Sequence, residues 1–102
     1  MQPDAAFFAN DIMAVGGMDA FRHECGMRVP EDVAVVGFDD IPMASWPSYQ
    51  LTTVQQPLAR MVDATVRFLA QSMAHPGTAA QAHSIPGKLI ERASTRGGPA
   101  RC

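Results

Sequence analysis

The stretch "VAVVGFDDIP" at residues 33–42 decides the fold, because an apolar run ends abruptly in two carboxylates. Five of the six residues at 33–38 are apolar, and three of them are valine. Such a run predicts a strand that is covered on both faces, as in a parallel sheet. Asp39 and Asp40 follow it. They therefore either form a turn or lie where a bound group needs hydrogen bonds.

A second strand and a helix are predicted upstream of this stretch. "AAFFA" at 5–9 indicates a short buried strand, which ends at Asn10 and Asp11, two residue types that favour helix N-caps. The helix is expected from about residue 12 to 25, and Gly26 is its expected stop. Strand, helix and strand within about thirty residues predict a parallel βαβ unit.

The predicted helix carries one apolar stripe, formed by Ala14, Met18, Phe21 and Cys25. Gly16 and Gly17 within it are expected where the helix backbone lies close to the sheet. Cys25 is expected to pack as a small apolar residue, and Cys102 to lie in a loose tail. These two cysteines give no sign of a disulfide scaffold.

Polar residues follow both predicted strands, and parallel strands place their carboxyl ends at one edge of the sheet. Asn10 and Asp11 should therefore lie close to Asp39 and Asp40. Ligand crevices of open α/β sheets lie at that edge, so Asn10 and Asp39 are candidate binding residues. Asp11 fits a helix cap better than a ligand contact, and Asp40 fits a turn or a cap.

The remaining chain supplies a second helix and two short extended segments. "LTTV" at 51–54 is extended, and a helix begins near Pro57 and ends near "HPGT" at 75–78. Asp63 and Arg67 have the spacing of an i,i+4 ion pair. One side of this helix is apolar, with Leu58, Met61, Val62, Leu69 and Met73. "SIPGKLIER" at 84–92 predicts a last strand, and 96–102 a disordered tail.

Composition limits the function classes. A chain of 102 residues, 47% hydrophobic and 18% charged, is one small globular domain or part of a larger one. A net charge of −2 gives no electrostatic reason to expect nucleic-acid contacts. No apolar run is long enough to span a membrane, and residues 1–11 do not resemble a signal peptide. A cytoplasmic location is expected.

Enzyme chemistry finds little support. Adjacent Asp39 and Asp40 would point to opposite sides of an extended backbone, which makes a poor acid–base pair. His23, His75 and His83 lack metal-ligand spacing. Neither nucleotide-binding glycine motif is present. We therefore expect no catalytic residues, no metal and no cofactor.

A family resemblance covers about residues 3–95. "PDAAFFANDIMAVGGMDAFRHECGMRVPEDVAVVGFDDIPMASWPSYQLTTVQQP" resembles the carboxyl-terminal part of a LacI-type bacterial transcriptional repressor, and "KLIERAST" resembles the closing segment of that family. "AND", "G-x-R-V-P-E-D-V", "V-V-G-F-D-D" and "L-T-T-V-x-Q-P" occur in order at family-like spacings.

The resemblance implies an α/β fold of the periplasmic-binding-protein type I, a parallel-sheet domain of two lobes that is incomplete here. Residues 1–95 would belong to this effector-binding domain, with 1–50 in the second lobe. Residues 51–76 would form the crossover and a helix of the first lobe, and 84–92 would return to the second lobe. The helix-turn-helix domain of the family, its hinge and the start of its first lobe have no counterpart here. Operator binding by this chain alone is therefore not expected.

The resemblance also implies site residues and partners. Asn10 and Asp39 match positions that hydrogen-bond the effector, and Gln56 matches a polar contact at the crossover. Trp46 is a candidate wall for a sugar ring. Gln56 could instead cap the helix after Pro57, and Trp46 could be a structural loop residue. The implied partners are a small effector, such as a sugar or purine, and a second copy in a homodimer.

Three functions remain open. The chain could be the effector-binding and dimerisation portion of a transcriptional regulator. It could be a truncated fragment without autonomous function, an alternative that the small number of predicted strands keeps open. It could also be a periplasmic sugar-binding protein, although such a protein should carry a signal peptide and lack the pair "LTTVQQP" and "IERAST".

Overall fold

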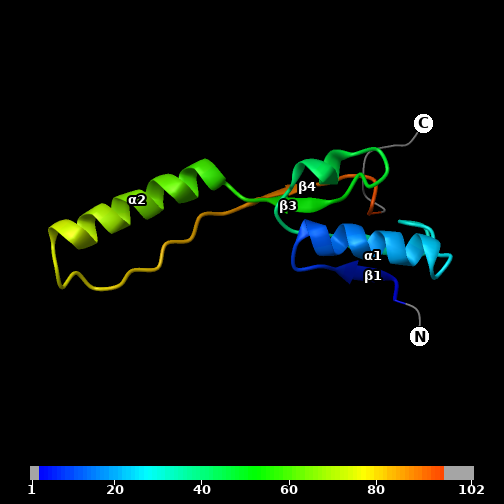
Figure 1. Ribbon diagram of the computed structural model, residues 1–102, viewed down its shortest axis with the longest axis horizontal. Helices are drawn as coiled ribbons and strands as arrows, with labels where there is room; N and C mark the ends of the chain where they lie inside the picture. The colour runs from blue at the N-terminus through cyan, green and yellow to red at the C-terminus, as the bar shows by residue number, and fades with distance from the viewer. Residues whose placement is uncertain (1–2, 96–102) are drawn as a thin grey trace. The chain divides into compact units, whose positions relative to one another are not determined.

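The computed structural model describes residues 3–95 (Figure 1). Their contacts divide them into two units. The first unit comprises the described residues up to Gln55 and from Lys88 onward, and the second comprises Gln56–Gly87. The predicted tail at 96–102, with Cys102, lies outside the described residues.

The first unit begins with the predicted βαβ arrangement. Strand β1 (Ala5–Phe7) pairs in parallel with β2 (Ala34–Val36), and helix α1 (Asp11–His23) connects them. Phe7 pairs with Val36 at the end of the register. The parallel βαβ prediction is thus confirmed, with strands of three residues each that are shorter than the apolar runs.

Helix α1 has well-defined ends. The side chain of Asn10 accepts a hydrogen bond of 2.9 Å from the backbone N–H of Met13, so Asn10 is the N-cap. The C-cap is Glu24, and Gly26 follows with φ of 63°, the left-handed turn expected after a helix. Cys25 lies in this turn and is exposed, so the prediction that it packs as an apolar residue is wrong.

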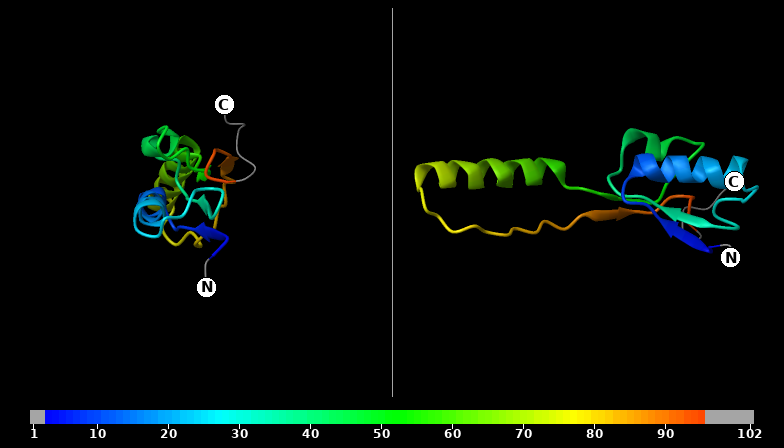
Figure 2. Two further views of the ribbon diagram at one scale, coloured as in Figure 1. Left: turned by 90° about the vertical axis from the view of Figure 1, so that its right-hand side faces the viewer. Right: turned by 60° about the horizontal axis from the view of Figure 1, so that its bottom comes forward.

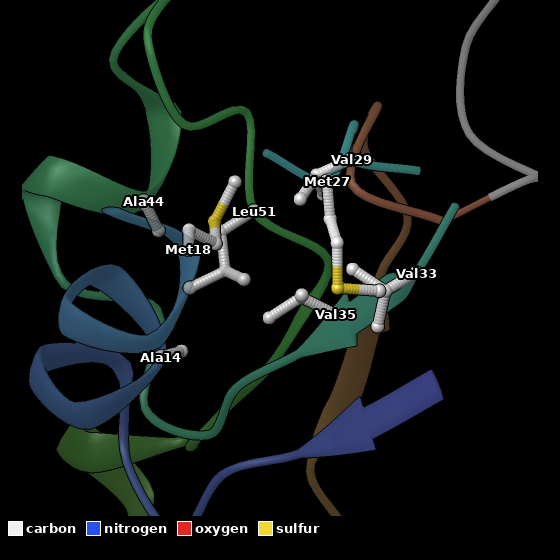
Figure 3. Close-up of a cluster of buried hydrophobic side chains, with 8 residues drawn as sticks. All are labelled: Ala14, Met18, Met27, Val29, Val33, Val35, Ala44 and Leu51. Carbon is white, nitrogen blue, oxygen red and sulfur yellow. The ribbon is translucent and has the colours of Figure 1, made fainter. Parts of the chain in front are cut away.

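A single apolar cluster forms the core of the first unit (Figure 3). Met18 of α1 meets Leu51, and Val35 of β2 lies beside them; all three are fully buried. The remaining members are Ala14, Met27, Val29, Val33 and Ala44, with Phe21 packed against the cluster. The predicted stripe on α1 is therefore buried at Ala14 and Met18 and half-buried at Phe21.

Burial of the sheet differs from the prediction. Val35 of β2 and Val33 just before the strand are buried, whereas Ala34 and Val36 on the other face of β2 are half-buried. In β1, which should be a buried strand, the side chain of Phe7 is 67% exposed. The core cluster lies on one side of β2, and residues 3–95 leave the other side incompletely covered.

Two further strands extend the first unit. Strand β3 (Thr53–Gln55) pairs antiparallel with β4 (Lys88–Ile90), as Figure 1 shows. Isolated parallel bridges from Val36 to Thr52 and from Asp39 to Gln55 join β3 to the β2 segment. The predicted strands at 51–54 and 84–92 are present, with shifted and shorter bounds.

The segment after β4 is anchored inside the first unit by Ser94. Its hydroxyl donates a hydrogen bond of 2.6 Å to the carbonyl of Val35 and accepts one of 2.8 Å from the backbone N–H of Thr52. The backbone N–H of Ser94 donates to the carbonyl of Gln50 at 2.9 Å, and its carbonyl accepts a hydrogen bond of 2.9 Å from the N–H of Val35. The carboxyl-terminal residues of the described chain therefore complete the first unit.

The second unit consists of helix α2 (Leu58–Ala74) and the segment after it. Pro57 is the N-cap, and Asp63 and Arg67 form the predicted ion pair at 3.2 Å. Residues 75–87 run back along the helix in Figures 1 and 2, and the rings of Phe68 and His83 lie 5.5 Å apart. No residue of α2 is buried. Neither helix described here is long and apolar enough to cross a membrane.

Candidate functional site

The polar residues after β1 and β2 meet at one edge of the sheet. The backbone N–H of Phe8 donates to the carbonyl of Val36 at 2.9 Å, and that of Asp11 donates to Phe38 at 3.1 Å. The predicted convergence of the Asn10–Asp11 and Asp39–Asp40 pairs follows from this backbone contact. Each of the four side chains nevertheless has a distinct environment.

Asp11 is a buried structural residue and is not the helix cap. Its Oδ1 accepts a hydrogen bond of 2.7 Å from Thr53, and its Oδ2 accepts one of 2.9 Å from the backbone N–H of Ile41. The side chain is fully buried. The prediction of a cap is wrong because Asn10 takes that position, one residue earlier. Asp11 instead joins α1 to the segments that follow β2 and precede β3.

Asp40 is paired through both of its carboxylate oxygens. Its Oδ1 lies 2.9 Å from the Nη2 of Arg92, and its Oδ2 accepts a hydrogen bond of 2.9 Å from Gln55. The side chains of Asp40 and Arg92 are only 12% and 15% exposed. The φ of Asp40 is 60°, so the backbone is not extended here. The expectation that Asp39 and Asp40 point to opposite sides assumed an extended backbone and therefore does not apply.

Asp39 occupies an unusual backbone conformation at the same edge. Its φ is 130°, a region that favours glycine and that costs a residue with a side chain about 1–3 kcal/mol. Its N–H donates to the carbonyl of Val54 at 2.9 Å. The residue is half-buried. Such conformations gather at functional sites, which supports the choice of Asp39 on grounds separate from its charge.

Asn10 is held in place by its role as a cap. The bond to Met13 uses Oδ1, and the Nδ2 group remains the donor end of the same amide. The side chain is half-buried at the amino end of α1. A capping residue at this position can present a fixed N–H donor to a ligand.

Trp46 and Gln56, the other two candidates, lie further along the chain. Trp46 is the C-cap of the short 3₁₀ helix η1 (Pro42–Ser45), and its side chain is 51% exposed. Gln56 opens the second unit, where its carbonyl accepts a hydrogen bond of 2.8 Å from the N–H of Leu58. The alternative that Gln56 caps α2 is wrong, because the N-cap is Pro57.

Sequence reasoning missed the partners of Asp40, which are Arg92 and Gln55. The sequence did contain a feature that could have predicted Arg92 as a partner. Two adjacent carboxylates at a buried strand end need compensation, and Arg92 is the basic residue at the end of the segment predicted to return to the sheet. Among residues 3–95, all buried side-chain nitrogen and oxygen atoms have hydrogen-bond partners, so this polar network is complete. No group of three potential ligands in the same range could hold a metal ion.

Comparisons with known proteins give a consistent result. The family model of the periplasmic binding protein-like domain matches residues 1–95. The ribose operon repressor of Halalkalibacterium halodurans is 36% identical over 95 residues, which are 93% of this chain and 28% of that protein. The chain thus spans less than a third of this relative.

Solved structures agree. The transcriptional regulator CelR in complex with cellobiose has a TM-score of 0.80 and 35% identity, over 89% of this chain and 28% of that one. The lac repressor dimer bound to operator and the anti-inducer ONPF has a TM-score of 0.76 and 36% identity, over 92% of this chain and 32% of that one.

Proposed function

Since this chain belongs to the periplasmic binding protein-like domain family and represents part of the effector-binding domain of LacI-type transcriptional regulators, we propose that it contributes to a site for a sugar-like effector. The observation that carries this proposal is Asp39, a half-buried carboxylate in a left-handed conformation at the carboxyl edge of the sheet. The named relatives are repressors and regulators rather than enzymes.

The roles follow from the chemistry of the side chains. The two carboxylate oxygens of Asp39 can accept hydrogen bonds from neighbouring hydroxyl groups of a sugar, and the Nδ2 of Asn10 can donate to a third oxygen. Trp46, with half of its side chain exposed, is the proposed apolar wall, and Gln56 is a further proposed polar contact. Cellobiose in the complex with CelR is a ligand of this chemical class.

Regulation would follow from differential affinity. An effector shifts a protein between two conformations only by binding one of them more tightly. We propose that the effector does this in a cytoplasmic homodimer, and that a helix-turn-helix domain outside residues 1–102 contacts the operator. The lac repressor dimer bound to operator supports this arrangement by analogy.

A second candidate is a fragment without autonomous function. Its support is the apolar side of α2, where Leu69 and Met73 are 60% and 74% exposed and no residue of the helix is buried. Surfaces of this kind are normally covered in a folded protein. This candidate predicts that the chain alone binds no effector.

The test is titration of the ¹⁵N-labelled chain with cellobiose and with ribose, followed by amide chemical shifts. Binding should shift the amides of Asn10 and Asp39, and Asp39→Ala should weaken it by about 1.5–3 kcal/mol, the contribution of a hydrogen bond to a charged group. Asp32→Ala is the matched control, because it removes an aspartate paired with Arg28 elsewhere in the first unit.

The two candidates give different results. If either sugar binds and Asp39→Ala leaves the affinity unchanged, Asp39 is not part of the site. If neither sugar shifts any amide of the wild-type chain, the fragment without autonomous function is the better description.

A further inference from the structure

Asp40 is restrained from three directions. Arg92 binds its Oδ1 and Gln55 its Oδ2, both at 2.9 Å, while its backbone N–H donates to the hydroxyl of Thr53 at 3.4 Å. The carboxylate is only 12% exposed. An aspartate whose two oxygens and N–H are all engaged has little freedom to turn.

Arg92 is itself fixed. Its Nη1 donates to the carbonyl of Leu51 at 3.0 Å, so the planar guanidinium spans Leu51 and Asp40. Its backbone exchanges hydrogen bonds with the hydroxyl of Thr52, which accepts from Arg92 N–H at 2.8 Å and donates to the Arg92 carbonyl at 3.0 Å. The position of this cation is thus set by the backbone of the segment before β3.

Asp39 lies between two restraints. Its N–H donates a hydrogen bond of 2.9 Å to the carbonyl of Val54, and the next residue in the chain is the restrained Asp40. Both aspartates have positive φ, 130° and 60°. Residues with side chains persist in this region only when their surroundings hold them there. The direction of the Asp39 carboxylate depends on φ, because φ sets the direction of the Cα–Cβ bond.

We propose that Arg92 and Gln55 are positioning residues that hold the carboxylate of Asp39 in its binding direction by fixing Asp40. This inference rests on the proposed function, since it concerns the same site. Arg92 and Gln55 do not contact the effector in this proposal. Without them, Asp39 relaxes towards a negative φ and its carboxylate moves away from the ligand.

The experiment measures the conformation of Asp39 and sugar affinity separately. The three-bond coupling between the amide and α protons is small at a φ of 130° and large in extended backbone, so it reports the conformation without a ligand. The variants are Arg92→Met, which removes the charge, Arg92→Lys, which keeps it, and Gln55→Ala at an exposed position.

Two controls separate positioning from stability. Arg28→Met breaks another arginine–aspartate pair of the first unit, the exposed pair with Asp32 at 3.0 Å. Ser94→Ala removes a buried hydroxyl two residues after Arg92 and should destabilise the first unit. Neither control should change the coupling of Asp39.

The expected result is a large Asp39 coupling in Arg92→Met and Gln55→Ala, with a partial return in Arg92→Lys. The apparent Kd for cellobiose or ribose should rise about tenfold, less than for Asp39→Ala, because a displaced carboxylate keeps part of its hydrogen bonding. If Arg92→Met does not fold, the Asp39 coupling and the sugar affinity of Gln55→Ala and Arg92→Lys test the proposal instead.

A small Asp39 coupling in these folded variants would overturn the proposal, whatever happens to affinity. A different result identifies failure of the proposed function alone: the coupling changes as expected, but Asp39→Ala leaves sugar affinity unchanged. In that case Arg92 and Gln55 fix the backbone at Asp39 and Asp40 without serving effector binding.

Discussion

The hydroxyl of Thr53 donates a hydrogen bond of 2.7 Å to the Oδ1 of Asp11, and both side chains are fully buried. The second oxygen of Asp11 accepts from the backbone N–H of Ile41. One carboxylate thus connects the start of α1, the segment after β2 and the start of β3. These are the elements that place Asn10 and Asp39 at the same edge.

Asp11→Asn should destabilise the first unit by about 1.5–3 kcal/mol, because an amide nitrogen would face either Thr53 or the N–H of Ile41 where an acceptor is needed. Urea unfolding followed by circular dichroism measures the change. Asp4→Asn is the matched control, since Asp4 is exposed and should change the free energy of unfolding by less than about 0.5 kcal/mol. An equal effect of the two substitutions would show that the buried bonds of Asp11 contribute little.

Gly37 and Gly16 should respond in opposite ways to alanine. A Cβ built at Gly37 would overlap the Oδ1 of Asp11, and it would lie 3.0 Å from Leu51 Cδ2, so Gly37→Ala must displace a buried carboxylate. A loss of about 1–3 kcal/mol is expected, as for an overpacked core. At Gly16, in the middle of α1, nothing lies within 4 Å of the new Cβ. Gly16→Ala should therefore stabilise the helix by about 0.5–1 kcal/mol. Urea melts of the two variants check both signs, and a stabilising Gly37→Ala would contradict the packing seen here.

The contrast between these glycines shows which features local sequence predicts. The apolar runs, the helix cap and the stop at Gly26 depend on neighbouring residues, and the βαβ unit was predicted from them. Both glycines at 16 and 17 were expected near the sheet. Of these two glycines, only Gly17 would bring a Cβ against another segment, the ring of Phe8 just after β1, whereas nothing lies within 4 Å of a Cβ at Gly16.

The polar network was less predictable, because it depends on residues far apart in the chain. The whole second unit lies between Asp40 and Arg92 in the sequence, so no local sequence pattern predicts that pairing. Asp11 and Asn10 are neighbours with similar N-cap preferences, and only the three-dimensional contacts to Thr53 and Ile41 distinguish their roles. Exposure of Phe7 likewise depends on what covers β1, which the apolar run cannot specify.

Arg28 and Asp32 should give the first unit a local dependence on acid. Hydrogen bonds from the guanidinium of Arg28 and from its backbone N–H lower the pKa of Asp32 from 3.8 to about 2. A carboxyl whose pKa is lower in the folded state stabilises that state above its unfolded pKa, and the contribution is lost as the pH falls through the folded value. The contribution of this pair should therefore be complete above about pH 4 and disappear between about pH 4 and 2.

Carboxyl carbon chemical shifts measured against pH would test this for Asp32. In Arg28→Met the pKa of Asp32 should return towards its ordinary value, whereas Arg92→Met should leave it unchanged, because Arg92 pairs with Asp40 instead. A titration of Asp32 near its ordinary value in the wild-type chain would mean that the pair is not populated in solution, as is common for exposed ion pairs.

The apolar side of α2 should control self-association of this chain. The side chains of Leu69 and Met73 are 60% and 74% exposed, and no residue of the helix is buried. Exposed apolar side chains that lie on one face of a helix promote association in water. The double substitution Leu69→Gln and Met73→Gln should therefore lower the average mass in sedimentation. It should change the free energy of unfolding of the first unit by no more than about 0.5 kcal/mol, because neither residue belongs to its core. Arg60→Gln, an exposed change on the same helix, is the control and should leave the mass unchanged. An unchanged mass together with a large loss of stability would show that this face of α2 is covered within the chain itself.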